Sequence, residues 1–391
     1  MSQEEKIQKK KKIIASLLKV KTINLAKAEK IYESFEKTDF IFKRVLTGNN
    51  ENIYAFDKKI NGLFLNFKNY GIKYEDVVNA AIKQPQLFYQ SPDTIKNNVW
   101  GVIEKFEEEK LSSKGYVKVA FEKPQLLCFS SETIERNIRG VAQKFEKNGL
   151  TTKKYLSFAL KNPQLFHMLP DTIEKNILGV VDKFKDEGLS FDKYFNAVLK
   201  APTLFYQSSD TVAGNINAVV EKFEKDGLEN KDYLKAALKQ PSLFYQNPKT
   251  VESNIKGVVN KFKLDGLTME SYLKAALRNP SLLSQSPDTI VEHIQIIKEM
   301  VADKVVSGKN DVFRVISGRS SVLSFSNDNL RLRHIYGHAL KNNQKKIRKL
   351  SSLLSMPRPE VEDKLIDELG AKSNEVLRLR KMNMFKYRGK C

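Results

Sequence analysis

Cysteine and long apolar runs are both scarce in this chain. Its 391 residues include two cysteines, Cys128 and Cys391, which are too few for a disulfide framework and fit a reducing compartment. No stretch of about 18 consecutive apolar residues occurs, so we expect no membrane-spanning helix and no membrane partner. The lysine-rich start contains acidic residues and no arginine, unlike a transit peptide. The expected location is a bacterial cytoplasm or nucleoid, or a eukaryotic nucleus or cytoplasm.

The sequence also lacks the patterns that support catalysis. It has no phosphate-binding glycine-rich loop, no Ser/His/Asp or Cys/His arrangement and no pair of carboxylates in an apolar setting. His334 and His338 have the spacing of metal ligands on one helix face, but no third ligand lies near them in the sequence. We therefore assign both to the solvated surface. We expect a protein that is not an enzyme and that binds neither a cofactor nor a metal.

What the sequence does contain is a strict repeat of 39 residues. Because one such unit cannot bury its apolar face alone, a repeat of this length predicts units stacked on copies of themselves, which is a solenoid. The prolines that mark the register are Pro85, Pro124, Pro163, Pro202, Pro241 and Pro280. Phenylalanines keep the same spacing at Phe67, Phe106, Phe145, Phe184, Phe223 and Phe262.

Each repeat begins with signals for a helix, which we name helix A. Ser91 stands where an N-cap belongs, Pro92 occupies the first helical position, and Asp93 faces the positive end of the helix dipole. Apolar residues then follow on one face with a 3.6-residue period. We expect helix A to end at a Gly-Leu pair such as Gly227-Leu228, with glycine in the left-handed conformation. The first repeat departs from this, with Lys110 in the glycine position.

A second helix, helix B, is expected after the Gly-Leu pair. It runs through sequences such as 233–238 and stops before the marker proline, because the residue before proline disfavours helical angles. A short apolar turn closes the repeat, and no stretch shows the alternation of a strand. The predicted fold is an all-α solenoid with helical end caps. Its expected parts are an N-terminal helical cap (1–55), the helical repeats (56–330) and a basic C-terminal helical segment (331–391).

The turn and the helix start together resemble the repeat of the mitochondrial transcription termination factor (mTERF) family. The order is helix, Gly-Leu, short helix, Pro-x-Leu-Leu/Phe and then Ser-Pro-Asp-Thr-Ile, and the resemblance covers residues 60–330. It implies a curved α-solenoid that binds double-stranded nucleic acid along its basic inner surface. The turns that carry it best are 85–88, 124–127 and 280–283.

Positive charge is concentrated at the two ends of the chain. The net charge is +21, and residues 331–391 hold 16 Lys and Arg against 6 Asp and Glu, while residues 1–30 hold 9 against 3. Ten of the 13 arginines lie after residue 270. Arginine offers a planar fork suited to phosphate or guanine, so the C-terminal end is where we expect the strongest contacts.

A lysine also recurs on helix A at the same repeat position. A helical wheel places acidic residues such as Glu104 and Glu107 on the opposite or outer side, which would leave a basic track for phosphates. A merely solvated face is an equal alternative. The predicted nucleic-acid-binding residues are Lys105, Lys144, Lys183, Lys222, Lys261, Arg278, Arg314, Arg319, Arg331, Arg333, Arg348, Arg358, Arg378 and Arg380.

Three further residue types recur once per repeat, and we favour structural roles for them. The helical Asn is expected to hydrogen-bond the loop of a neighbouring repeat, and the helical Gly to permit close helix approach. The Tyr at the start of helix B is expected in the core, with base stacking as the alternative. These positions are Asn98, Asn137, Asn176, Asn215 and Asn254, followed by His293; Gly101, Gly140, Gly179 and Gly257; and Tyr116, Tyr155, Tyr194, Tyr233 and Tyr272.

These features favour a monomeric, non-enzymatic protein that binds nucleic acid, duplex DNA first, and acts in transcription or its regulation. The alternative is a protein-binding scaffold or effector of the same shape, whose basic ends serve solubility or attract an acidic partner.

Overall fold

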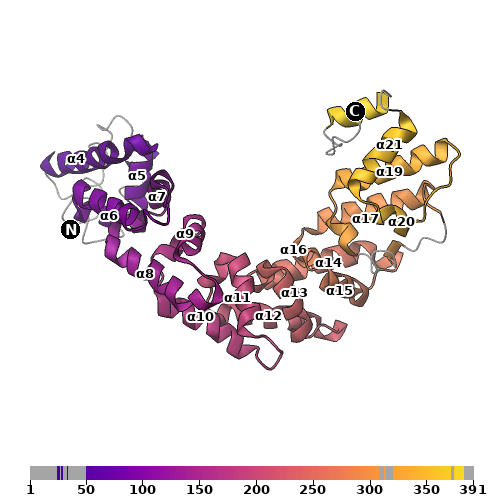
Figure 1. Cartoon of the computed structure of the whole chain (residues 1–391), viewed down its shortest axis with the longest axis horizontal. Coiled ribbons are helices and arrows are strands. Elements are labelled where there is room, and N and C mark those ends of the chain that lie inside the picture. Colours follow the sequence, from indigo (N-terminus) through magenta and orange to yellow (C-terminus); the bar gives the residue numbers. More distant parts are fainter. Residues whose placement is uncertain are drawn as a thin grey trace, which may run out of the picture. The chain divides into compact units, whose positions relative to one another are not determined.

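The structure is a computed structural model that describes residues 24–26, 28, 29, 33, 50–307, 312, 313, 320–370 and 374–382. Within these ranges every regular element is helical, and the single isolated β-bridge joins Ser307 to Lys349. The predicted all-α solenoid is therefore confirmed (Figure 1). In the same ranges, no helix combines the length and the apolar character that crossing a bilayer would need.

The described residues up to 176 form one compact unit, which we call unit 1. Each helix A packs on the next one, α4 on α6 and α6 on α8, and helices B pack in the same order, α5 on α7 and α7 on α9, so that the unit has two layers. The helices A are α4 (Asn50–Phe67), α6 (Pro92–Lys105) and α8 (Ser131–Lys144). The helices B are α5 (Tyr74–Lys83), α7 (Ser113–Glu122) and α9 (Thr152–Lys161). The apolar turns are the 3₁₀ helices η2 (Pro85–Tyr89), η3 (Pro124–Cys128) and η5 (Pro163–Phe166).

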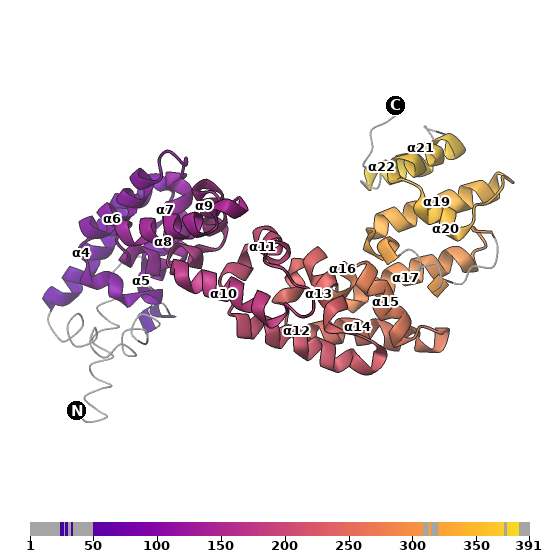
Figure 2. The same ribbon diagram turned by 60° about the horizontal axis from the view of Figure 1, so that its bottom comes forward.

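The described residues from 177 onward form unit 2, and α10 (Pro170–Lys183) contains the boundary between the units. Figure 2 shows the same two-layer order here, with α12 packed on α14, and α11 and α15 on either side of α13. The helices A are α12 (Ser209–Phe223), α14 (Pro248–Phe262), α17 (Pro287–Ala302) and α19 (Asn327–Asn342). The helices B are α11 (Phe191–Lys200), α13 (Asn230–Lys239) and α15 (Met269–Arg278). The turns are η6 (Pro202–Phe205), η8 (Pro241–Phe244), α16 (Ser281–Ser284) and η10 (Ser320–Ser324), and the chain continues through α20 (Leu350–Ser355), α21 (Arg358–Leu369) and α22 (Asn374–Lys381).

The expected start of helix A is confirmed, but its end lies earlier than predicted. The Ser91 hydroxyl accepts a hydrogen bond from the Thr94 N–H, with Pro92 at the first helical position. The α-helix then ends at Lys105, and a tight turn leads to the left-handed residue. That residue is glycine in four later repeats, with φ between 80° and 95°. Lys110 takes the same conformation at φ 61°, so the first repeat keeps the turn without its glycine.

The repeated Asn and Gly have structural roles, as predicted, but the Asn bonds the apolar turn of its own repeat and not the loop of a neighbouring repeat. The side chain of Asn254 donates to the carbonyl oxygen of Leu283 in the turn that closes its repeat, at 3.1 Å. Asn137 and Asn215 make the equivalent bond, and His293 replaces Asn with a 2.7 Å contact to a backbone oxygen. The absent side chain of the repeated Gly makes room for the next helix A. A Cβ on Gly257 would lie only 2.7 Å from Pro287.

The repeated tyrosines belong to the core, as predicted. All five are no more than 1% exposed, so their rings are not available to stack on bases. The hydroxyls of Tyr155, Tyr233 and Tyr272 donate to backbone carbonyl oxygens of the following apolar turn. Burial raises the pKa of these phenols. The tyrosines therefore fasten the turn to helix B.

The expected limits of the three parts do not coincide with helix ends. The limit at residue 55 falls inside α4, and the limit at residue 330 falls inside α19. α19 continues the series of helices A, with Lys304 and Gln344 in the left-handed conformation at the ends of the last two. Most of the predicted N-terminal cap lies outside the described residues. The helical packing therefore extends beyond the last marker proline.

Candidate nucleic-acid interface

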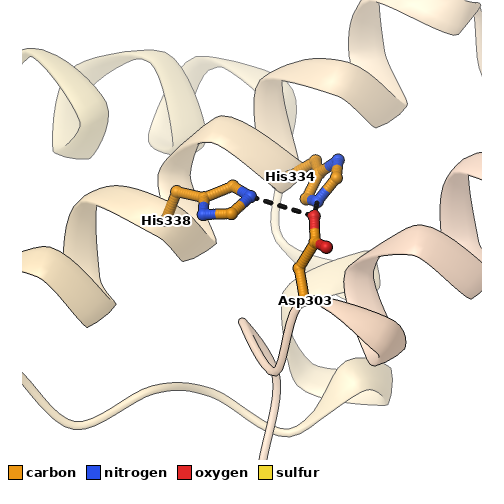
Figure 3. A group of neighbouring side chains, drawn as sticks. All are labelled: Asp303, His334 and His338. Atoms are coloured by element: carbon orange, nitrogen blue, oxygen red, sulfur yellow. Dashed lines mark hydrogen bonds and ion pairs between the residues drawn. The ribbon is translucent and has the colours of Figure 1, made fainter.

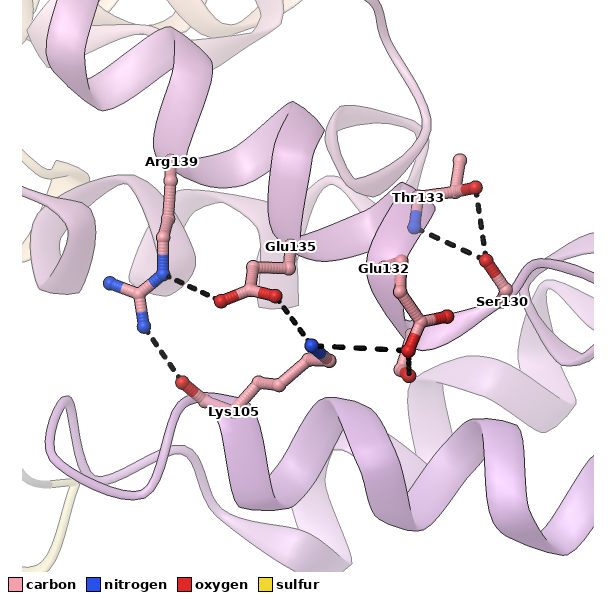
Figure 4. Close-up of polar contacts among 7 residues, drawn as sticks. Lys105, Ser130, Glu132, Thr133, Glu135 and Arg139 are labelled. Carbon is pink, nitrogen blue, oxygen red and sulfur yellow. Dashed lines mark hydrogen bonds and ion pairs between the residues drawn. The ribbon is translucent and has the colours of Figure 1, made fainter.

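The lysine at the end of helix A forms ion pairs with the following helix A. In unit 1, the Lys105 ammonium nitrogen lies 2.6 Å from a carboxylate oxygen of Glu135 and 3.9 Å from Glu132 (Figure 4). Lys144 repeats the arrangement with Glu174 at 2.6 Å and Asp171 at 3.0 Å. We call these inter-repeat contacts the ion-pair ladder. They connect α6 to α8 and α8 to α10.

The ladder changes the electrostatic character of the predicted lysine track. The hydrogen bond to Glu135 raises the pKa of Lys105, and the same bond holds the pKa of Glu135 below its usual range. Arg139 adds a second cation on Glu135, at 3.1 Å. The expectation that acidic side chains lie on the opposite or outer side and leave a basic track is thus wrong for these repeats. Each lysine faces carboxylates of the next repeat.

In unit 2 the ladder weakens along the chain. Lys183 pairs with Asp210 at 3.1 Å. The next repeat carries Lys249 at the position equivalent to Asp210, and its Glu252 pairs with Lys256 instead. Among the described residues, no ion pair joins Lys222 or Lys261 to a carboxylate. These two lysines are exposed and stay candidates for phosphate contact.

The predicted arginines are in different surroundings. Arg333 is 1% exposed, its guanidinium donates to the backbone oxygens of Asn329 and Met356, and burial lowers its pKa to about 10. Its predicted role in binding is wrong, because a phosphate cannot reach it. Arg331 pairs with Glu292 at 3.4 Å and Arg358 with Glu362 at 2.6 Å. Arg278 and Arg378 are exposed and Arg348 is half-buried, whereas Arg314, Arg319 and the side chain of Arg380 lie outside the described part.

A second row of cations lies at the last turn of helix B, and Arg278 is its one member among the residues predicted from the sequence to bind nucleic acid. In unit 2 it consists of Lys200, Lys239 and Arg278, all exposed, at the ends of α11, α13 and α15. We name these three residues the helix-B row. Unit 1 has the equivalent Lys83 and Lys161. Within the described ranges, neither Lys200 nor Lys239 has a carboxylate partner.

The sequence contained a signal for this row. Its members precede the marker prolines by two residues and share the 39-residue spacing. In the first full repeat, Glu122 stands at this position and interrupts the row. The helical wheel of helix A indicates a different set, the lysines that begin with Lys105. Lys105, Lys144 and Lys183 of the helix-A set pair with carboxylates of the next repeat, whereas the three members of the helix-B row are exposed.

The two histidines of α19 have the third partner that the sequence did not reveal. Figure 3 shows the rings of His334 and His338 pointing at one oxygen atom of Asp303, the residue that caps α17. The Nε2–Oδ2 distances are 2.7 Å for His334 and 3.1 Å for His338. The assignment of both histidines to the solvated surface is therefore corrected, because each ring contacts Asp303.

The chain was compared with curated proteins and with models of protein families. A search of curated proteins finds no match. The model of the mTERF family matches residues 2–208, more than half of the chain. The same 39-residue period continues beyond the matched segment to Pro280. The chain belongs to the mTERF family of helical repeat proteins.

Proposed function

We propose that this protein binds nucleic acid as a monomer, without catalysing a reaction, and that duplex DNA is its main ligand. The proposed role is in transcription or its regulation. The observation that carries the proposal is the helix-B row of unit 2, three exposed cations at one repeat position on successive helices. The net charge of +21 and the membership of the mTERF family support it.

The geometry of the helix-B row suits a charged polymer. Packed helices lie about 8–10 Å apart, so cations at one position of adjacent helices recur at a regular short interval. A duplex presents about one phosphate charge per 1.7 Å of its axis, and each cation that neutralises a phosphate releases bound counterions. A row of single cations contacts backbone rather than base edges, which favours binding with little sequence preference.

A cation in the last turn of a helix also has a structural benefit. It interacts with the negative end of the helix dipole and stabilises the helix by about 0.3–1 kcal/mol. This benefit requires no ligand and would exist in any helical protein. The two roles are separated by measuring nucleic-acid affinity and folding stability on the same variants.

The direct test is binding to matched ligands at several salt concentrations. Duplex DNA, duplex RNA and single-stranded DNA of equal length are titrated with the full chain near physiological salt. We expect the tightest binding to duplex DNA and a steep loss of affinity as salt rises. Equally weak binding to all three would refute the proposal and favour a protein-binding scaffold.

A further inference from the structure

The cluster of Asp303, His334 and His338 joins two successive helices A of unit 2. Asp303 follows the last residue of α17, and the left-handed Lys304 next to it reverses the chain direction there. The two histidines lie one turn apart on α19, and their rings lie 4.8 Å apart by centroids. One ligand atom from each residue lies within 4.8 Å of the other two.

In two other repeats, an acidic residue at the position of Asp303 contacts the next helix A without a histidine. Glu109 pairs with Arg139 at 2.9 Å, and Asp265 pairs with Lys298 at 2.8 Å. In both cases the acid precedes the left-handed turn and meets a cation on the next helix A. One cation is sufficient for that contact. At Asp303 two imidazoles replace the single cation, and both aim their Nε2 atoms at the same carboxylate oxygen.

We propose that Asp303, His334 and His338 bind a zinc ion. Two imidazole nitrogens and a carboxylate oxygen are a donor set that Zn²⁺ accepts, with water completing the tetrahedron. Ligand bonds of about 2.0–2.1 Å place neighbouring ligand atoms about 3.3 Å apart. The observed Nε2–Oδ2 separations of 2.7 and 3.1 Å would have to open by about 0.6 and about 0.2 Å.

The surroundings leave the cluster open to an ion. The side chains of Asp303 and His338 are each 44% exposed, and that of His334 is 16% exposed. Lys341 donates to the backbone oxygen of Asp303 and not to its carboxylate. Zinc would displace the protons that the Nε2 atoms share with the carboxylate. The bound ion would cross-link the end of α17 to the middle of α19 and so stabilise the C-terminal repeats, independently of nucleic-acid binding.

The test is zinc binding by the full chain without an affinity tag, measured against a coloured competing chelator. We expect one zinc ion per chain and a higher melting temperature with zinc than with chelator. Replacing zinc by Co²⁺ should give visible absorption bands typical of tetrahedral coordination. The variant with both His334→Gln and His338→Gln should lose these bands and weaken zinc binding at least about tenfold.

The matched control is His167→Gln, a half-buried histidine of unit 1. It should leave the zinc affinity and the cobalt bands unchanged. If the double variant fails to fold, the single variant His338→Gln carries the same test, because that imidazole is largely exposed. Equal zinc binding by wild type and the cluster variant, or no binding by the wild type, would overturn the proposal.

Discussion

The side-chain nitrogen of Asn254 donates a hydrogen bond to the carbonyl oxygen of Leu283, 29 residues later, across a distance of 3.1 Å. Asn254 is 5% exposed, and it links helix A of its repeat to the apolar turn that closes the same repeat. The recurrence of this bond at two other Asn positions makes it a regular component of the solenoid.

Replacing Asn254 by Ala should destabilise unit 2 by about 1–3 kcal/mol, because the Leu283 oxygen would lose its buried partner. Urea unfolding followed by circular dichroism measures the change. Asn260→Ala is the control, since Asn260 is exposed on the same helix, and it should stay within about 0.5 kcal/mol of wild type. Equal effects of both substitutions would show that the bond has no special role.

Two glycines of the same repeat should respond in opposite ways to alanine. Gly227 has φ 84° and open space where a Cβ would lie, so Gly227→Ala meets only the backbone penalty of about 1–2 kcal/mol. Gly214 lies inside α12, also with open space, so Gly214→Ala should stabilise by about 0.5–1 kcal/mol. Thermal unfolding of the two variants compares them. A stabilising Gly227→Ala would contradict the need for a left-handed residue at the end of helix A.

The ion-pair ladder predicts a pH-dependent difference between wild type and Glu135→Gln. Lys105 and Arg139 hold the pKa of Glu135 below its usual range, so the carboxylate stabilises the folded state above its unfolded pKa of about 4.3. This contribution should be about 0.2–1 kcal/mol at neutral pH and should vanish as the pH falls through the lowered pKa. Unfolding curves of both proteins, recorded at several values between about pH 3 and about pH 7, measure this contribution to the free energy of unfolding.

The control for this experiment is Glu146→Gln, an exposed residue with no ion pair among the described contacts. The free energy of unfolding of this control should differ little from that of the wild type over the whole pH range. A wild-type advantage over Glu135→Gln that grows as the pH falls would have the wrong sign for a carboxylate with a lowered pKa.

The strict period predicts that one whole repeat can be removed. Deleting residues 203–241 joins Pro202 to Ser242 and keeps every repeat position in register. Because each repeat contacts mainly its neighbours, the shortened chain should remain soluble and equally helical per residue. Circular dichroism and size-exclusion chromatography provide the measurement. Deleting 203–239 instead shifts the register by two residues, and the prediction fails if that variant folds while the in-register deletion does not.

The repeat made the fold predictable from sequence because the core residues recur with it. Phe223 and Tyr233, for example, are each no more than 1% exposed and have counterparts 39 residues away on either side. A structural role for the Asn could be predicted because a polar residue on the edge of an apolar stripe needs a partner, but the position of that partner in the same repeat could not. The positive φ of Lys110 could not be predicted from the residue type, because lysine does not favour the left-handed conformation that glycine adopts in the later repeats.

The site was less predictable because its contacts depend on how adjacent helices are aligned. Glu135 lies 30 residues after Lys105, and only the close approach of α6 and α8 at Gly101 brings the two together. Arg333 is buried and donates to the backbone oxygen of Met356, 23 residues later. The local sequence around Arg333 does not predict this contact. The contact between Asp303 and His334 also depends on tertiary packing, because the turn at the end of α17 places Asp303 beside α19, 31 residues before His334.

The measurement that tests the central proposal most directly is the salt dependence of duplex-DNA affinity for two triple variants. One replaces the helix-B row by Gln (Lys200, Lys239 and Arg278), and the other replaces the ladder lysines by Gln (Lys105, Lys144 and Lys183). If each row residue neutralises one phosphate, the first variant should lower the magnitude of the slope of log affinity against log salt by about 2.7. The ladder variant should change the slope much less, because carboxylates already pair with its lysines. Equal slopes for the helix-B variant and the wild type would contradict the proposal.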